Sequence, residues 1–91
     1  MLVITEKVPG GKLVRIKVSL DNNEIKNIQI TGDFFMHPES GVEILEQQLQ
    51  NTKITNIKKK IDETVAAHNI QIIGFTSDDI ARMVQSTEVK P

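Results

Sequence analysis

Asp33, His37 and Glu39 are the residues whose types and spacing come nearest to a chemical site. An imidazole four positions after a carboxylate, with a second carboxylate close by, is able to bind a metal ion or exchange a proton if the groups share a surface. A four-residue spacing guarantees a common face only on a helix, and Pro38 and the aromatic run before it argue against a helix here. We therefore interpret the segment as a strand that ends in a turn, and we expect no metal or catalytic residue in it.

Three other polar segments have structural interpretations. His68 falls near the C-terminal end of a predicted helix, where a cation stabilises the helix dipole. A helix would spread the basic run 58–60 around most of its circumference, which indicates a solvated face, although such a run is also able to contact phosphate. The Gly-Gly-Lys segment at 10–12 lacks the spaced first glycine and the following Ser or Thr of a phosphate-binding loop. Without a Gly-x-Ser-x-Gly motif either, nothing indicates a self-sufficient enzyme.

Composition excludes several classes of function. The chain has 91 residues and a formal net charge of −1, so it lacks the basic excess that drives nucleic-acid binding. It has no cysteine, which excludes disulfides, thiolate catalysis and cysteine-ligated metal sites. No apolar run approaches the roughly 20 residues that cross a bilayer, and the start does not resemble a signal peptide. We expect a cytoplasmic protein that binds neither nucleic acid nor membrane.

The first third of the chain predicts a three-stranded antiparallel meander. Leu2–Val8 forms a first strand, which ends at the turn-forming residues Pro-Gly-Gly. A second strand begins at Lys12, and its alternation indicates one buried face. The Asp21–Glu24 segment tolerates the left-handed conformation and predicts a tight hairpin into a third strand, from about Ile25 to Ile30. The predicted inward side chains of the second strand are Val14, Ile16, Val18 and Leu20.

After Pro38 the apolar period lengthens from two to about 3.6, which predicts helices. The first spans roughly 41–50, with Ser40 and Glu43 in a capping-box pattern. The second, capped by Thr55, ends near residues 68–69, and the third follows the acidic cap at 77–79. Between them, 70–75 is apolar enough for a fourth strand. The apolar stripe of the second helix is Ile57, Ile61 and Val65, and pairs at four-residue spacing on its exposed side are Lys58 with Asp62 and Lys59 with Glu63.

These elements predict an α+β fold in which a small antiparallel sheet of three to four strands is covered on one face by two to three helices. A chain of this size supports one core, so we expect a single domain over 1–91. The sheet half occupies about 1–35 and the helical half about 39–86.

The segment from Gly32 to Pro38 holds most of the aromatic surface of the chain. Neighbouring side chains on a strand point to opposite faces, so only one of Phe34 and Phe35 is able to enter the core if the strand conformation persists. The other requires a covering helix or a partner.

The order of these motifs resembles the accessory domain of lipoate-protein ligases. The resemblance covers roughly 9–84 and includes the glycine turn, the alternating strand and the Asp-Asn-Asn hairpin. Its strongest parts are Ile-x-Ile-x-Gly-Asp-Phe-Phe at 28–35 and Leu-Glu-x-x-Leu at 45–49. One departure is Asn51, which stands where the family often has the glycine that ends the first helix; asparagine also tolerates a left-handed cap. The domain is fused to the catalytic domain in many bacteria and is a separate small subunit in some archaea.

The resemblance implies a non-catalytic accessory subunit of a two-chain lipoate-protein ligase. The catalytic subunit would bind lipoate, ATP and magnesium, form lipoyl-adenylate and pass the lipoyl group to a lysine of a carrier domain. Those carriers belong to 2-oxoacid dehydrogenases or the glycine cleavage system. The accessory chain would bind no cofactor by itself and would be needed chiefly for adenylation.

For that role we expect Phe34, Phe35, Met36 and His37 to contact the catalytic subunit, with Asp33 anchoring the turn. The alternative that both phenylalanines are core residues stays open. So do two other classes: a stand-alone small-ligand or protein-binding module, because fold alone does not settle function, and a domain that self-associates through an exposed sheet edge.

Overall fold

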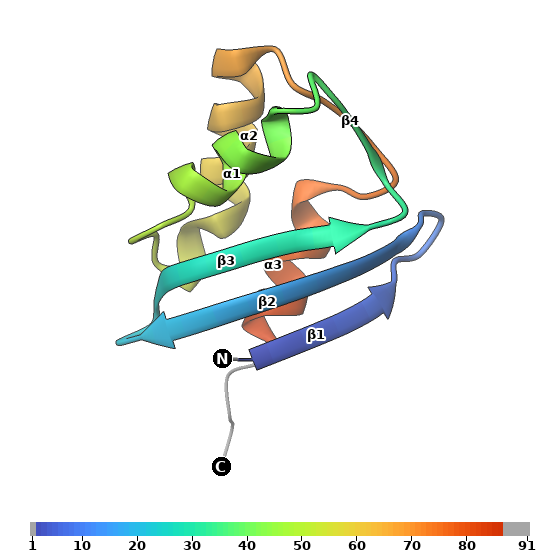
Figure 1. The fold of residues 1–91 in the computed structure, drawn as a ribbon. Coiled ribbons are helices and arrows are strands. Elements are labelled where there is room, and N and C mark those ends of the chain that lie inside the picture. Colours follow the sequence, from blue (N-terminus) through green and yellow to red (C-terminus); the bar gives the residue numbers. More distant parts are fainter. Residues whose placement is uncertain (1, 87–91) are drawn as a thin grey trace.

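The computed structural model describes residues 2–86, and its first three strands form the predicted meander. β1 (Leu2–Lys7), β2 (Leu13–Asp21) and β3 (Glu24–Gly32) lie side by side in chain order and pair antiparallel (Figure 1). Ile16 pairs with Ile4 on one side and Ile30 on the other. Val14, Ile16 and Val18 are fully buried, so the alternation predicted for the second strand is confirmed, with Leu20 partly buried at its end.

The hairpin between β2 and β3 is the predicted tight turn. Asn22 and Asn23 both have positive φ, 53° and 63°, as a two-residue type I′ turn requires. The register shifts between Ser19 and Leu20, which inserts an extra residue into β3. This bulge explains why Ile25 and Ile28, three positions apart, are both buried.

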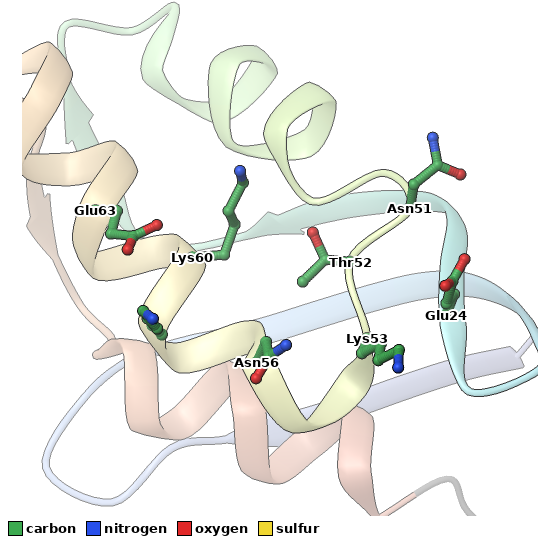
Figure 2. Close-up of a pocket in the computed structure, with 8 residues that line it drawn as sticks. Glu24, Asn51, Thr52, Lys53, Asn56, Lys60 and Glu63 are labelled. Atoms are coloured by element: carbon green, nitrogen blue, oxygen red, sulfur yellow. The ribbon is translucent and has the colours of Figure 1, made fainter.

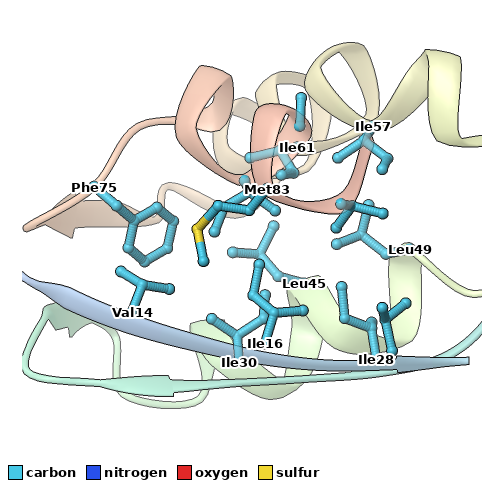
Figure 3. Packing of buried hydrophobic residues seen from close by; sticks show 14 of the residues in the cluster. Val14, Ile16, Ile28, Ile30, Leu45, Leu49, Ile57, Ile61, Phe75 and Met83 are labelled. Atoms are coloured by element: carbon cyan, nitrogen blue, oxygen red, sulfur yellow. The ribbon is translucent and has the colours of Figure 1, made fainter. Parts of the chain in front are cut away.

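Three helices cover one face of the meander. They are α1 (Gly41–Gln48), α2 (Ile57–His68), preceded by the short 3-10 helix η1 (Ile54–Asn56), and α3 (Ser77–Gln85) (Figure 1). Apolar residues of these helices interdigitate with the inward side chains of β2 and β3 to form one core (Figure 3). The α+β architecture and the helix boundaries, within two residues, are as predicted.

The predicted fourth strand does not extend the meander. β5 (Gln71–Ile73) pairs antiparallel with β4 (Phe35–His37), and the two form a separate sheet. The aromatic segment after β3 is therefore a separate strand, β4. Its partner, β5, comes from the helical half of the chain, between α2 and α3. The peptide bond between His37 and Pro38 is cis.

Two predicted helix caps are wrong. Ser40 is the N-cap residue of α1, but it has helical dihedral angles instead of the extended ones that a capping side chain needs, and it makes no side-chain cap bond. Thr55 lies inside η1, which leads directly into α2. The structure has a capping box one residue before the predicted third cap: the Thr76 hydroxyl accepts from the N–H of Asp79, and the Asp79 carboxylate accepts from the N–H of Thr76.

Candidate partner-binding surface

The turn between β3 and β4 is fixed by backbone contacts. The N–H of Asp33 donates to the carbonyl of Leu13 at 3.0 Å, while the Asp33 side chain is exposed. A Cβ atom at Gly32 would lie 2.2 Å from that same carbonyl oxygen, so only glycine permits the approach. The main-chain N–H of Asp33 therefore anchors the turn, and the role of Asp33 at a partner interface stays a prediction.

Phe34 and Phe35 face opposite ways. The ring of Phe34 packs edge to face on Phe75, with ring centroids 4.9 Å apart, and adds to the core. Phe35 is 64% exposed, Met36 is buried, and His37 is exposed. The prediction that only one phenylalanine enters the core is confirmed, and the alternative of two core phenylalanines does not hold.

A pocket of about 250 Å³ lies along this segment, lined by Phe34, Phe35, Met36, His37, Glu39 and Val42. Four of the five predicted interface residues thus share one concave surface, to which α1 contributes Val42. The fifth, Asp33, lies in the preceding turn and is not part of the lining. We call this surface the aromatic groove.

The aromatic groove is bordered by a second exposed apolar side chain. Ile73 of β5 is the direct cross-strand partner of Phe35 and is 47% exposed. Two large apolar residues side by side in water are a feature of contact surfaces more than of closed domains. No pattern in the sequence marks Ile73 for this role, because its pairing with Phe35 depends on the separate β4–β5 sheet.

Asp33, His37 and Glu39 do not converge. Within residues 2–86, no group of three or more His, Asp and Glu side chains is placed to hold a metal ion. Asp33 precedes β4 and His37 ends it, which agrees with the interpretation of the segment as a strand that ends in a turn.

Within the lysine run at 58–60, Lys58 makes an ion pair and Lys59 does not. Lys58 donates to Asp62 at 2.8 Å, as predicted, and the Ser77 hydroxyl donates to the same carboxylate. The bond from Lys58 and then that from Ser77 hold the pKa of Asp62 below its usual value. Lys59 makes no ion pair with Glu63 within 4 Å, so that predicted pair is wrong.

A polar pocket of about 390 Å³ was not predicted from the sequence (Figure 2). It lies between the start of β3, the loop after α1 and the first turns of α2. Its lining is Glu24, Asn51, Thr52, Lys53, Asn56, Lys59, Lys60 and Glu63. Asn51 has a φ of 65°, which confirms that asparagine fills the left-handed position predicted for it.

The chain is a small α+β domain with an exposed apolar edge at the aromatic groove. Residues 2–84 match the model of the family described as the bacterial lipoate protein ligase C-terminus, and the chain belongs to this family.

No helix within residues 2–86 is long and apolar enough to cross a bilayer.

Two relatives come from Thermoplasma acidophilum. The chain is 47% identical over 45 residues to lipoate-protein ligase A subunit 2, an alignment that covers 50% of this chain and 48% of the relative. The chain thus spans about half the length of this curated relative in the alignment. A solved chain from an archaeal lipoylation system, a bi-partite lipoate protein ligase and its E2 lipoyl domain, has a TM-score of 0.74 and 29% identity, with 98% of both chains covered.

Proposed function

We propose that this chain is the accessory subunit of a two-chain lipoate-protein ligase. The observation that carries the proposal is the structural match over 98% of both chains to a component of a bi-partite ligase system. The catalytic subunit would activate lipoate with ATP and magnesium to lipoyl-adenylate and transfer the lipoyl group to carrier lysines. The chain itself would supply no catalytic side chain, and its cysteine-free composition suits the cytoplasm.

The aromatic groove is the surface that we assign to the catalytic subunit. Phe35 and Ile73 offer a rigid apolar anchor, because both belong to the β4–β5 strand pair. The side chains next to Phe35 in sequence, Phe34 and Met36, pack into the core and hold this pair in place. An exposed aromatic side chain of this kind is the usual centre of a binding hot spot. Docking there would order mobile loops of the catalytic subunit and exclude water, so that adenylation takes place among preorganised donors.

The test is lipoate-dependent pyrophosphate release by the catalytic subunit from the same genome, with and without this chain. We expect release only when both are present, and a loss of release with Phe35→Ala. The matched control is Val3→Ala, since Val3 is also a large exposed apolar residue but lies on β1, away from the groove. Equal release with and without the chain would contradict the proposal.

The polar pocket favours a second candidate, a stand-alone module for a small polar ligand, because its lysine and glutamate side chains offer both charges around one space. Screening the isolated chain by thermal shift against charged metabolites tests this candidate. A ligand that raises the melting temperature of wild type and not of Lys60→Gln would support it.

A further inference from the structure

The aromatic groove runs along the free edge of β4. Phe35 and His37 of this strand are exposed and Met36 between them is buried, so their side chains leave on opposite faces. A surface lined by all three therefore borders an edge of the strand instead of one of its faces. β5 covers one edge of β4 and contributes no residue to the lining, so the groove follows the other edge.

This edge of β4 has no partner strand. β4 and β5 form a sheet of two strands only. Within residues 2–86, the one β-bridge outside the named strands joins Glu24 and Lys53, at the opposite end of β3 (Figure 1). A strand edge without a partner is a place where another chain is able to add a strand.

Pro38 decides which main-chain groups of β4 face the groove. In an antiparallel strand pair, residue pairs that exchange hydrogen bonds alternate with residue pairs that exchange none. If Met36 and Ile72 were the bonded pair, the last of the three residue pairs would depend on an N–H at position 38, which proline lacks. The bonded pairs are therefore the first and the last. The N–H and C=O of Met36 consequently point away from β5, into the groove.

The main chain of Met36 is thus nearly buried and without a partner. The residue is 5% exposed, and within residues 2–86 no group outside the strand pair bonds to its N–H or C=O. Buried main-chain groups are rarely left unpaired, because losing water without gaining a protein partner costs free energy. A donor and an acceptor on one edge match one residue of an extended chain. The middle of a helix does not fit, since its own main-chain groups are already paired.

We propose that the aromatic groove receives an extended segment of the catalytic subunit, which adds a strand to β4. This inference rests on the proposed function. One residue of the segment accepts a hydrogen bond from the N–H of Met36 and donates one to its C=O. The residues on either side of it then point to the same face as Phe35. Because Phe35 and Ile73 make that face apolar, the segment carries an apolar side chain there.

The first experiment measures amide hydrogen exchange by NMR in the wild-type chain, alone and with the catalytic subunit from the same genome. We expect exchange of the Met36 amide to slow about tenfold in the complex, because it gains an acceptor. The amides of Phe35 and His37 should change less, since they are already bonded to β5. An unchanged Met36 amide in the complex would overturn the inference.

The second experiment compares Met36→Pro with Met36→Val. Both changes shorten the buried side chain, but only proline removes the N–H. The two variants should melt at similar temperatures, because that N–H has no partner within residues 2–86. We expect Met36→Pro to bind the catalytic subunit about tenfold more weakly than Met36→Val in calorimetric titration. Equal affinities would overturn the inference. If Met36→Pro melts far below Met36→Val, exchange in the wild-type chain decides.

The outcomes separate this inference from the proposed function. If the two chains co-elute and release pyrophosphate together while the Met36 N–H is neither protected nor needed, the added strand is wrong and the accessory function stands. If wild type neither co-elutes with the catalytic subunit nor changes its pyrophosphate release, the accessory function fails. Protection of the Met36 amide in the isolated chain, with a dimer in light scattering, would overturn the inference by assigning the groove to a second copy.

Discussion

The carboxylate of Glu46 accepts a hydrogen bond from the backbone N–H of Ile30 at 2.8 Å. Glu46 lies on α1 and Ile30 on the outer edge of β3, so the bond fastens the helix to the sheet beside the core residues Leu45 and Leu49. The Leu-Glu-x-x-Leu motif therefore has a structural explanation: the two leucines fill the core, and the glutamate satisfies an N–H that the meander leaves unpaired.

Removing this contact should destabilise the fold. We expect Glu46→Ala to lower the free energy of unfolding by about 1.5 to 3 kcal/mol, because a hydrogen bond to a charged group is lost and the N–H of Ile30 is left without its partner. Urea unfolding of Glu43→Ala, an exposed glutamate on the same helix, is the control and should change little. Equal losses in the two variants would contradict the role given to Glu46.

Alanine at Phe34 should lower the stability of the fold, whereas alanine at Phe35 should weaken binding to the catalytic subunit. Phe34→Ala removes the edge-to-face contact with Phe75 and should cost about 2 kcal/mol or more of unfolding free energy. Phe35→Ala should change it by less than about 0.5 kcal/mol and weaken binding to the catalytic subunit about 30-fold, equivalent to roughly 2 kcal/mol. Thermal melts and calorimetric titration measure the two quantities. Normal binding by a folded Phe35→Ala protein would remove the aromatic groove from the interface.

The β1–β2 turn should tolerate alanine at one glycine and not at its neighbour. The N–H of Lys12 donates to the Gly74 carbonyl at 2.9 Å, and a Cβ at Gly11 would lie 2.3 Å from that oxygen, whereas one at Gly10 meets nothing within 4 Å. We expect Gly11→Ala to cost about 3 kcal/mol by forcing the turn away from Gly74, which follows β5. Gly10→Ala should cost only about 1 kcal/mol, from its positive φ. Denaturant midpoints of the two variants give the comparison.

The capping box of α3 should make stability fall in acid. Burial raises the pKa of Asp79, but hydrogen bonds from Thr76 and Arg82 outweigh it and hold that pKa below its usual value. A carboxyl whose pKa is lower in the folded state stabilises the fold above its unfolded pKa of about 4, and this contribution is lost as pH falls through the folded pKa.

We therefore expect Asp79→Asn to be about 1 kcal/mol less stable than wild type at pH 7, with the difference shrinking as pH falls below about 4. Melting curves between neutral and strongly acidic pH measure this. Asp78→Asn, an exposed acid in the same turn, should show a smaller difference at every pH. A difference for Asp79→Asn that stays constant with pH would contradict the assignment.

The periodicity of apolar residues predicted most of the helices and strands, because each of these elements is specified by residues close together in sequence. Alternation along β2, the Asn22-Asn23 turn and the 3.6-residue stripe of α2 each specify their element without distant contacts. The β4–β5 pairing was missed because it joins residues more than thirty positions apart, and each strand has only three residues. Such short strands carry too little pattern to reveal their partners.

The candidate surface was predicted only in part, because some of its features depend on local geometry and others on contacts between distant segments. The opposite directions of Phe34 and Phe35 agree with the alternation of side chains along a strand, although Phe34 immediately precedes β4. Ile73 and the polar pocket depend on contacts between segments distant in sequence, and the failed caps at Ser40 and Thr55 depend on the turns that precede the helices. Residue types mark these positions as caps, but Ser40 has a helical backbone and Thr55 lies inside η1, so neither has the extended backbone of a capping residue.

The two edges of the meander differ, and this limits how the chain could polymerise. At one end of β3, Ile25 exchanges backbone hydrogen bonds with Asn51 and Thr52, and further along Glu46 occupies the N–H of Ile30. Strand addition to this three-stranded sheet is therefore confined to the side of β1. Growth of a fibre by pairing between the edges of the meander needs two open edges on every meander, so pairing through β1 alone stops at two copies.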